Sequence, residues 1–283
     1  MSGLQDHFAG GITTLCRAWA LTRADGLVRG FTDHDRALSF EGIDFRPETG
    51  MSASALVQGA GLAADTAEAL GAISDDGITE AEIAQGRLDG ATLRIWRVNW
   101  AEPAQRALEF RGLLGEIRRD GTVFRAELRG LSDLLNRPLG RVYQPRCDAS
   151  LGDTRCGFDA RQPGFAETRP LAQAEGTRLR FDWPDGPQAG WFAQGRVEVV
   201  DGPGAGLSAP IREDRCEGDA RLIELWQPIC ADLAPGATLR LVAGCDKRGE
   251  TCQLKFDNFL NFRGFPHLPG TDWLMAVPRS GGA

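Results

Sequence analysis

"GCDKRGETCQLKFDNFLNFRGFPHLPG", residues 244–270, brings together residue types that seldom share one short segment. Cys245 and Cys252 are separated by six residues, basic side chains lie beside them, and four phenylalanines and a histidine follow. A metal site, a cysteine nucleophile and a disulfide would each place cysteines in such a setting. The rest of the chain must distinguish between these three chemistries.

A second pair of cysteines, Cys147 and Cys156, lies upstream with eight residues between its members. It falls in residues 141–175, which are rich in Arg, Asp and Gly and show little periodicity. Both pairs have basic neighbours, and nearby positive charge favours the thiolate that binds metal. The same cations would offset the negative charge of a four-thiolate site. They are Arg146, Arg155, Lys247 and Arg248.

The spacing of the cysteines bears on which metal they would bind. Structural zinc usually takes cysteines two to four residues apart, and the spacings of eight and six are wider than that. An iron–sulfur cube is larger than one ion, and its cysteines can come from longer loops. The spacing therefore favours an iron–sulfur cluster, with zinc as the alternative.

Three further cysteines stand outside these pairs. Cys16 lies beside Leu15 in a predicted strand and is expected to be a small buried side chain. Cys216 and Cys230 flank a predicted hairpin, where we expect buried thiols or a local pair and not metal ligands. The total of seven is odd, so at least one cysteine has no partner within the chain.

A cysteine hydrolase is the rival chemistry, and it needs a histidine and an orienting Asp or Asn near the thiol. His267 lies between prolines, which indicates a rigid turn, and His34 is flanked by Asp33 and Asp35, which it can cap or pair with. The third histidine is His7. "GPGAG" lacks the Lys-Ser/Thr of a phosphate loop and is expected to be a hairpin turn.

Composition and charge limit the class of protein. The net charge of −7 argues against a nucleic-acid grip along the whole chain, because phosphate binding needs surplus Lys and Arg. We expect no secretory signal in the first residues, which lack a basic start and an apolar stretch. No apolar run approaches a membrane span of about 18 residues. We therefore expect assembly in a reducing cytoplasm, where cysteines are seldom in disulfides.

The sequence predicts a mainly β protein with short helices, because its 36 glycines punctuate short apolar runs. Residues 1–140 are expected to form a β-rich domain with a small helical insertion at about 51–90, and residues 141–283 a β domain with the cysteine loops. Thr79 and Glu82 form a predicted capping box, with Gly86 at the helix end. The other predicted elements are strands at 13–24, 91–100, 222–228 and 237–244, hairpins at Asp25-Gly26, 108–130 and 195–213, a helical turn at 131–140, and an amphipathic helix from Cys252 to Phe262.

Several motifs carry a resemblance to a known family. "LWQP", the quoted segment continued by "TDW", the upstream C-x8-C-G and "GFTDHDRAL" resemble the tail-tip hub proteins of tailed phages and of the gene transfer agents of alphaproteobacteria. The chain is also similar to the tail-tip protein of lambda-like siphophages, which carries a C-terminal iron–sulfur cluster. The resemblance spans most of the chain and is densest in residues 226–273.

The resemblance implies a ligand set. The family has an eight-spaced and a six-spaced pair of cysteines, which correspond to Cys147, Cys156, Cys245 and Cys252 as ligands of a [4Fe-4S] cluster. The additional Cys216 and Cys230 leave a swapped ligand open. We expect the segment from Cys252 onward to shield the cluster from water through Phe256, Phe259, Phe262 and Phe265.

The resemblance also implies a structural role without catalysis. It describes a β-barrel or sandwich hub that forms a homotrimeric ring at the tail tip of a virion-like particle. One side would contact the distal tail protein ring and the other a central fibre-like protein, with a tape-measure or peptidase component as a further partner. DNA would pass through without specific binding, which suits the acidic balance, and no stable membrane insertion is expected. A tail-associated cysteine peptidase or cell-wall hydrolase is the alternative.

Overall fold

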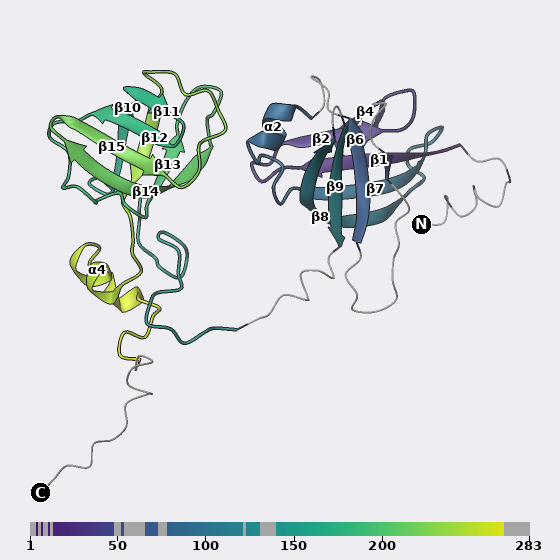
Figure 1. The fold of residues 1–283 in the computed structure, drawn as a ribbon. Coiled ribbons are helices and arrows are strands. Elements are labelled where there is room, and N and C mark those ends of the chain that lie inside the picture. The colour runs from purple at the N-terminus through teal and green to yellow at the C-terminus, as the bar shows by residue number, and fades with distance from the viewer. Residues whose placement is uncertain are drawn as a thin grey trace, which may run out of the picture. The chain divides into compact units, whose positions relative to one another are not determined.

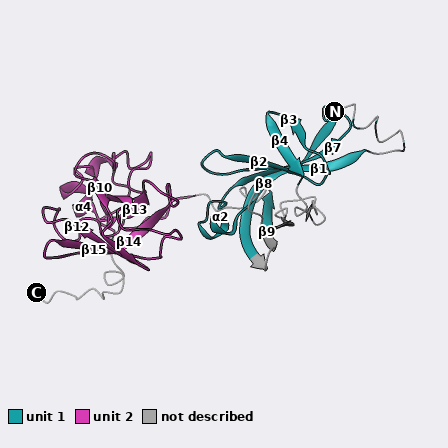
Figure 2. Ribbon diagram, turned by 90° about the horizontal axis from the view of Figure 1, so that it is seen from above, with its two compact units in different colours: residues 1–139 teal, residues 140–283 magenta. Residues whose placement is uncertain are grey.

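The computed structural model describes residues 14–47, 52–53, 66–72, 78–120, 123–130 and 140–268, together with residues 4, 7 and 11. The chain divides into two compact units, residues 1–139 and 140–283 (Figure 2). Both units are built mainly from strands, with few short helices. No helix in the described ranges combines the length and the apolar character needed to cross a bilayer.

The described part of unit 1 holds a nine-stranded sheet in the order β3-β4-β2-β1-β7-β8-β9-β6-β5 (Figure 1). All neighbours pair antiparallel except β2 and β4, which are parallel. The strands are β1 (Leu15–Thr22), β2 (Val28–Thr32), β3 (Leu38–Phe40), β4 (Ile43–Pro47), β5 (Ser52–Ala53), β6 (Thr66–Ala72), β7 (Thr92–Asn99), β8 (Arg106–Asp120) and β9 (Val123–Gly130). The predicted strand at 13–24, the hairpin around Asp25-Gly26, the strand at 91–100 and the hairpin at 108–130 are confirmed.

Alternation along β1 buries both faces of the sheet. Trp19 and Leu21 join one apolar cluster, whereas Ala18 and Ala20 join another on the opposite face. This follows from the two-residue period of a strand. The small alanines share their cluster with three aromatic rings, which contact one another face to face or edge to face. These rings are Phe40, Phe45 and Trp96.

Helix α2 (Glu80–Ala84) begins at the predicted capping box. The backbone N–H of Glu82 donates to the hydroxyl of Thr79 at 3.2 Å, and the carboxylate of Glu82 accepts from the backbone N–H of Thr79. Gly86 has a φ of +66°, the left-handed conformation that ends helices. Arg23 and Arg29 also donate to the Glu82 carboxylate, both at 2.7 Å, and tie the helix to the first hairpin.

The predicted helical insertion at about 51–90 is only partly helical. Its described helix spans five residues, and residues 66–72 form strand β6, which pairs along β9. The Ala and Gly content of this segment obscured the two-residue alternation that would have indicated a strand. The predicted helical turn at 131–140 lies outside the described residues except for its last position.

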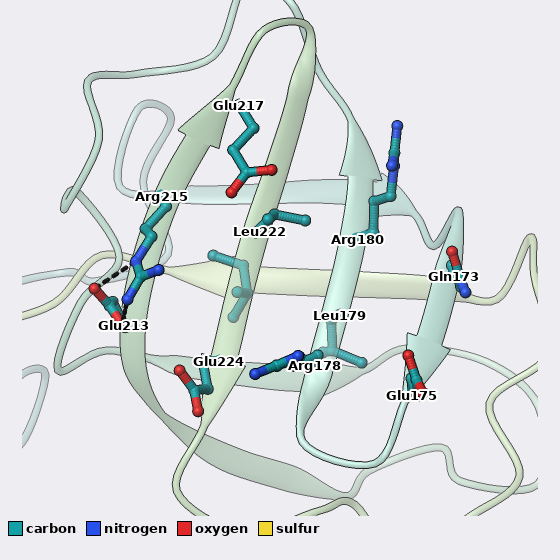
Figure 3. A pocket seen from close by; sticks show the side chains of 11 residues that line it. Gln173, Glu175, Arg178, Leu179, Arg180, Glu213, Arg215, Glu217, Leu222 and Glu224 are labelled. Carbon is teal, nitrogen blue, oxygen red and sulfur yellow. Dashed lines mark hydrogen bonds and ion pairs between the residues drawn. The ribbon is translucent and has the colours of Figure 1, made fainter.

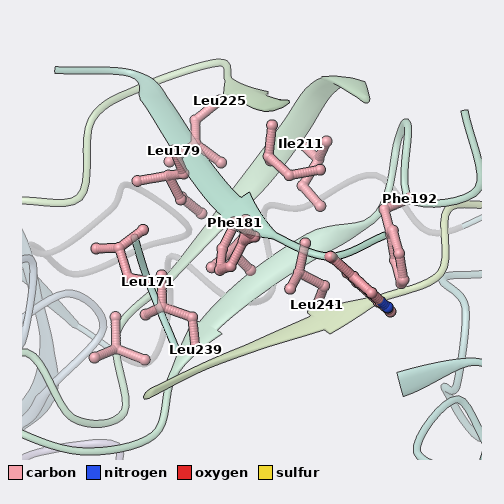
Figure 4. Close-up of a cluster of buried hydrophobic side chains, with 13 residues drawn as sticks. Leu171, Leu179, Phe181, Phe192, Ile211, Leu225, Leu239 and Leu241 are labelled. Carbon is pink, nitrogen blue, oxygen red and sulfur yellow. The ribbon is translucent and has the colours of Figure 1, made fainter. Parts of the chain in front are cut away.

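Unit 2 holds a seven-stranded antiparallel sheet in the order β10-β16-β13-β14-β15-β12-β11. The strands are β10 (Ala166–Pro170), β11 (Gln173–Glu175), β12 (Arg178–Asp182), β13 (Arg196–Val199), β14 (Ser208–Glu217), β15 (Ala220–Leu225) and β16 (Thr238–Val242). Their inward side chains form one apolar core (Figure 4) that includes Phe181, Ile211 and Leu241. The predicted hairpin with the Gly-rich tip and the two later strands are confirmed.

A buried ion pair lies inside unit 2. Arg221 donates to both carboxylate oxygens of Asp214, at 2.8 and 2.6 Å, and neither side chain is more than 1% exposed. The remaining Arg221 hydrogens bind the carbonyls of Pro187 and Gln188, and the Asp214 carboxylate also accepts from the backbone N–H of Phe192. The pair therefore fixes the loop between β12 and β13 to the β14–β15 hairpin.

The predicted amphipathic helix from Cys252 to Phe262 is wrong in its bounds. Helix α4 spans Gly249–Leu254, and a separate 3-10 turn, η1, spans Phe259–Asn261. Asp257 between them has a φ of +46°, which a continuous helix cannot contain. The apolar spacing suggested one buried face, but Leu260 is 99% exposed. The break turns the segment back toward the cysteines.

Candidate metal centre

The two cysteine-bearing segments lie side by side at one end of unit 2 (Figure 1). We call residues 140–160 and 244–268 together the cysteine lobe. Backbone hydrogen bonds join its halves: Cys147 N–H donates to the carbonyl of Lys247 at 2.9 Å, and Phe265 N–H to that of Gln144 at 2.9 Å. Gly264 permits this approach, because a Cβ there would lie 2.6 Å from the carbonyl oxygen of Pro145.

All four predicted ligands line one pocket within the lobe. Cys147 and Cys156 come from the upstream loop, Cys245 follows β16, and Cys252 lies in α4. Of the eight remaining lining residues, four are apolar, two are cations and two are amides. These residues are Ala149, Leu151, Phe256, Phe262, Lys247, Arg248, Asn258 and Asn261. Folding thus gathers the two pairs around one space.

Burial disfavours the charged form of two of the pocket thiols, those of Cys252 and Cys245. Burial raises the pKa of Cys252 to about 11, and the other three thiols of the pocket add to the rise. Burial likewise raises the pKa of Cys245, which the N–H and charge of Lys247 partly oppose. Four thiolates here would be stable only with a positive group between them, because desolvation and mutual repulsion both favour the protonated form.

The backbone of Lys247 forms hydrogen bonds with two of the cysteines. Its φ of +66° is unusual for a residue with a side chain. In this conformation its N–H points at Cys245, while its carbonyl accepts the Cys147 N–H. The Lys247 ammonium binds the carbonyl of Ala149 in the upstream loop. The strained residue therefore holds both halves of the lobe together at the thiols.

Hydrogen-bond donors also reach the sulfurs of Cys147 and Cys156. The backbone N–H of Arg263 lies 3.4 Å from Sγ of Cys147, and Nδ2 of Asn258 lies 3.6 Å from Sγ of Cys156. Cys252 itself donates to the carbonyl of Asn258 at 3.4 Å. Donors aimed at sulfur stabilise the thiolate form and are a usual feature of iron–sulfur sites. The sequence prediction missed Asn258, because this residue does not differ in context from neighbouring polar residues such as Asp257 and Asn261.

The basic residues of the cysteine lobe have different roles. Lys247 and Arg248 line the pocket, as expected for charge compensation. Arg155 instead pairs with Asp148 of the same loop at 3.0 Å. Lys255 donates to the carbonyls of Trp191 and Gly244, at 2.6 and 2.9 Å, and burial lowers its pKa.

Aromatic rings attach the lobe to the strands of unit 2. Phe158 and Phe256 of the lobe contact each other and Phe165, with centroid separations between 4.9 and 5.5 Å. Phe165 in turn contacts Trp191, over which Lys255 lies. Of the four phenylalanines expected to shield the site, only Phe256 and Phe262 line the pocket. Phe259 stacks on Phe262, and Phe265 packs on Tyr143.

The remaining cysteines lie elsewhere. Cys16 is buried in β1, as predicted, and burial raises its pKa to about 11. The expectation of burial is wrong for Cys216 and Cys230, which are both exposed. Cys216 lies near the end of β14, where the hairpin leaves the core, and Cys230 lies in the loop after β15.

In the described part of the chain, the contacts of the histidines are with residues other than the four pocket cysteines. His7 accepts from Thr14, and His34 stacks on Trp100 beside Asp35. His267 is exposed in a turn. None of the recorded contacts of these three rings involves a cysteine. The expected pairing of His34 with a neighbouring aspartate is confirmed.

A separate open groove of about 390 Å³ lies on the outer face of β11, β12, β14 and β15 (Figure 3). Positively charged arginines and negatively charged glutamates both line the groove, and Leu222 is among its apolar lining residues. Glu213 is hydrogen-bonded to Arg215, which lowers its pKa.

Two sequence families match the chain. Residues 1–159 match "Baseplate hub protein, N-terminal attachment domain", and residues 190–272 match "Phage conserved hypothetical protein BR0599". The first match contains Cys147 and Cys156, and the second contains Cys245 and Cys252. No curated protein is similar enough to count as a match.

A solved structure described as "Virion of native gene transfer agent (GTA) particle" contains a similar chain. The two chains are 51% identical, and the alignment covers 100% of this chain and 98% of the other with a TM-score of 0.91. Because the hub match spans more than half of the sequence and this relative covers all of it, the protein belongs to the family of baseplate hub proteins.

Proposed function

We propose that the protein is a structural hub at the tail tip of a gene transfer agent particle and that its cysteine lobe holds a [4Fe-4S] cluster. One observation carries the cluster: Cys147, Cys156, Cys245 and Cys252 line a single pocket although they come from two distant segments. When bound, the cluster would supply a covalent cross-link between these segments and the positive charge that four thiolates require.

The spacing of the cysteines supports a cluster over zinc, because zinc-binding cysteines are usually two to four residues apart, whereas these pairs have eight and six residues between their members. Zinc would need all four sulfurs at about 2.3 Å from the metal.

Anaerobic purification with analysis of iron, sulfide and zinc tests the cluster. We expect iron, sulfide and absorbance near ~400 nm from charge transfer between thiolate and iron. Changing any of the four ligands to serine should lower bound iron sharply, whereas Cys16→Ser and Cys216→Ser should not. Loss of metal in Cys216→Ser or Cys230→Ser, with iron retained in Cys147→Ser, would overturn the ligand assignment.

The proposed place in the particle rests on the family and on the virion relative. The protein would join the distal tail ring to a central fibre-like protein as a homotrimer and form part of the channel through which DNA leaves. A net charge of −7 suits a wall that DNA must pass without being held. Electron microscopy of intact particles is expected to show three copies at the tail tip. Six copies, or a position on the capsid, would contradict this role.

The enzymatic alternative has little support from the site. A cysteine peptidase needs an imidazole beside the thiol, and the described contacts of the histidines lead elsewhere. Peptidoglycan hydrolysis by purified protein that is lost in both Cys245→Ala and His267→Ala would favour the enzyme.

A further inference from the structure

We infer that Asn258 is the positioning residue of the cysteine lobe: its side-chain amide fixes Cys156 and supplies a hydrogen bond to the sulfur of that ligand. The inference rests on the proposed cluster and concerns how the chain tunes it.

Asn258 contacts both halves of the lobe. Its Nδ2 donates to the carbonyl of Cys156 at 2.8 Å and lies 3.6 Å from the sulfur, although the two residues are 102 positions apart. Its backbone N–H donates to the carbonyl of Cys252 at 3.0 Å, and its own carbonyl accepts from the Cys252 thiol. One residue therefore connects a ligand of each pair.

The side-chain amide of Asn258 is oriented by a hydrogen bond from Asn261. Oδ1 of Asn258 accepts from Nδ2 of Asn261 at 2.7 Å, which leaves the NH₂ group of Asn258 to face Cys156. Both asparagines line the pocket, and Asn258 is half-buried. The preceding Asp257 has a φ of +46°, so the backbone turns sharply to place Asn258 over the sulfurs. A polar group held this way at the edge of an apolar pocket acts on the thiols more strongly than a solvated one.

The expected consequence is a measurable effect on the bound cluster. Hydrogen bonds to ligand sulfur stabilise negative charge and thereby raise the reduction potential. Groups that orient metal ligands typically contribute about 10- to 100-fold in affinity. Removing the amide should therefore lower the potential and weaken retention of the cluster together. A residue that only supported the loop would change retention without changing the potential.

The test compares the full-length wild-type protein with Asn258→Ala and Asn258→Asp after anaerobic reconstitution with iron and sulfide. Asn258→Asp keeps the shape of the side chain but replaces the donor by a carboxylate. We expect the absorbance near ~400 nm to decay about 10- to 100-fold faster in the presence of a chelator in both variants. The midpoint potential should become more negative in the order wild type, alanine, aspartate.

Resonance Raman bands of the iron–sulfur stretch supply a readout that does not need an accessible redox couple. Loss of a hydrogen bond to sulfur strengthens the bond from sulfur to iron, so the bands should move to higher frequency in Asn258→Ala. Asn261→Ala leaves Asn258 in place but frees its amide, and it should show a smaller shift in the same direction. Gln253→Ala removes an exposed amide of α4 and should match the wild type.

The outcomes separate the two proposals. If the wild-type protein binds neither iron nor sulfide, the cluster and this inference both fail. If the wild type binds the cluster and the variants keep its potential, its Raman bands and its lifetime, only the role of Asn258 is wrong. Should Asn258→Ala fail to fold by circular dichroism, Asn258→Asp and Asn261→Ala decide the matter.

Discussion

The cysteines of this protein occupy three environments that differ in burial. Cys16 is 8% exposed and lies between strands, where its thiol donates to the carbonyl of Val98. Cys216 and Cys230 are exposed, and the four lobe cysteines face the shared pocket. Because only the thiolate reacts with disulfide reagents, burial should separate these groups chemically.

Thiol labelling checks this separation. In the cluster-bound protein at pH 8 we expect rapid labelling of Cys216 and Cys230 alone, counted with a coloured disulfide reagent and mapped by mass spectrometry. Cys16 should stay protected, because its pKa is raised to about 11 by burial and almost no thiolate exists at that pH. Cys216→Ser should remove one fast thiol. Rapid labelling of Cys16 in the folded protein would contradict the burial seen in β1.

The two cysteine pairs could be predicted because residue type and spacing are read directly from the sequence. It could not predict Asn258, whose importance depends on a loop 102 residues away. It also did not reveal the Arg221–Asp214 pair, since neither residue differs in sequence context from the exposed charges around it. The burial of that pair follows from the packing of Trp183 and Phe192 against Arg221.

At the scale of elements, short-range signals were sufficient for the strands that were predicted, but not for β6 or for the C-terminal helix. Turn residues and two-residue alternation gave the hairpins, because both are local properties. The spacing of Phe256, Phe259 and Leu260 also fits a helix, yet Asp257 adopts a positive φ and the helix ends at Leu254. The competing interaction is tertiary: Asn258 binds Cys156, which a straight helix would not allow.

Glu82 offers a test at the same scale, because it caps α2 and accepts from Arg23 and Arg29. Burial alone would raise its pKa, but hydrogen bonds from Arg29 and Thr79 and the two positive charges lower it. Its folded-state pKa thus lies below the unfolded value, so its contribution is present above the unfolded pKa and is lost as pH falls through the folded one. We expect Glu82→Gln to destabilise unit 1 by about 1.5–3 kcal/mol at pH 7.

Urea unfolding of the two proteins between pH 7 and pH 3 measures the effect. The difference in the free energy of unfolding should shrink as pH falls below the usual range of a glutamate. Glu102→Gln is a suitable control, because the Glu102 carboxylate accepts from the side-chain amide of Gln105 at an exposed site. A difference that stays constant with pH would mean that the carboxylate charge of Glu82 contributes nothing.

At the scale of the whole molecule, the two units differ in what stabilises them. In its described part, unit 1 has apolar clusters on both faces of its sheet. Unit 2 has its own apolar core, but the cysteine lobe outside that core contains no strand and depends on hydrogen bonds between its two halves. A cross-link there would restrict the unfolded chain, because it closes a long loop.

Removing the cluster should therefore loosen one end of unit 2 first. With the cluster chelated or oxidised, we expect limited proteolysis to cut within residues 140–160 and 244–268 well before unit 1 is attacked, because uncompensated thiols leave the lobe with only its hydrogen bonds and aromatic contacts. Cys147→Ser should show the same early cuts without chelator, and Cys216→Ser should resist like the cluster-bound protein. The fragments are identified by mass spectrometry over a time course. Equal cutting of both units, with and without the cluster, would mean that the cysteines do not cross-link the two halves of the lobe.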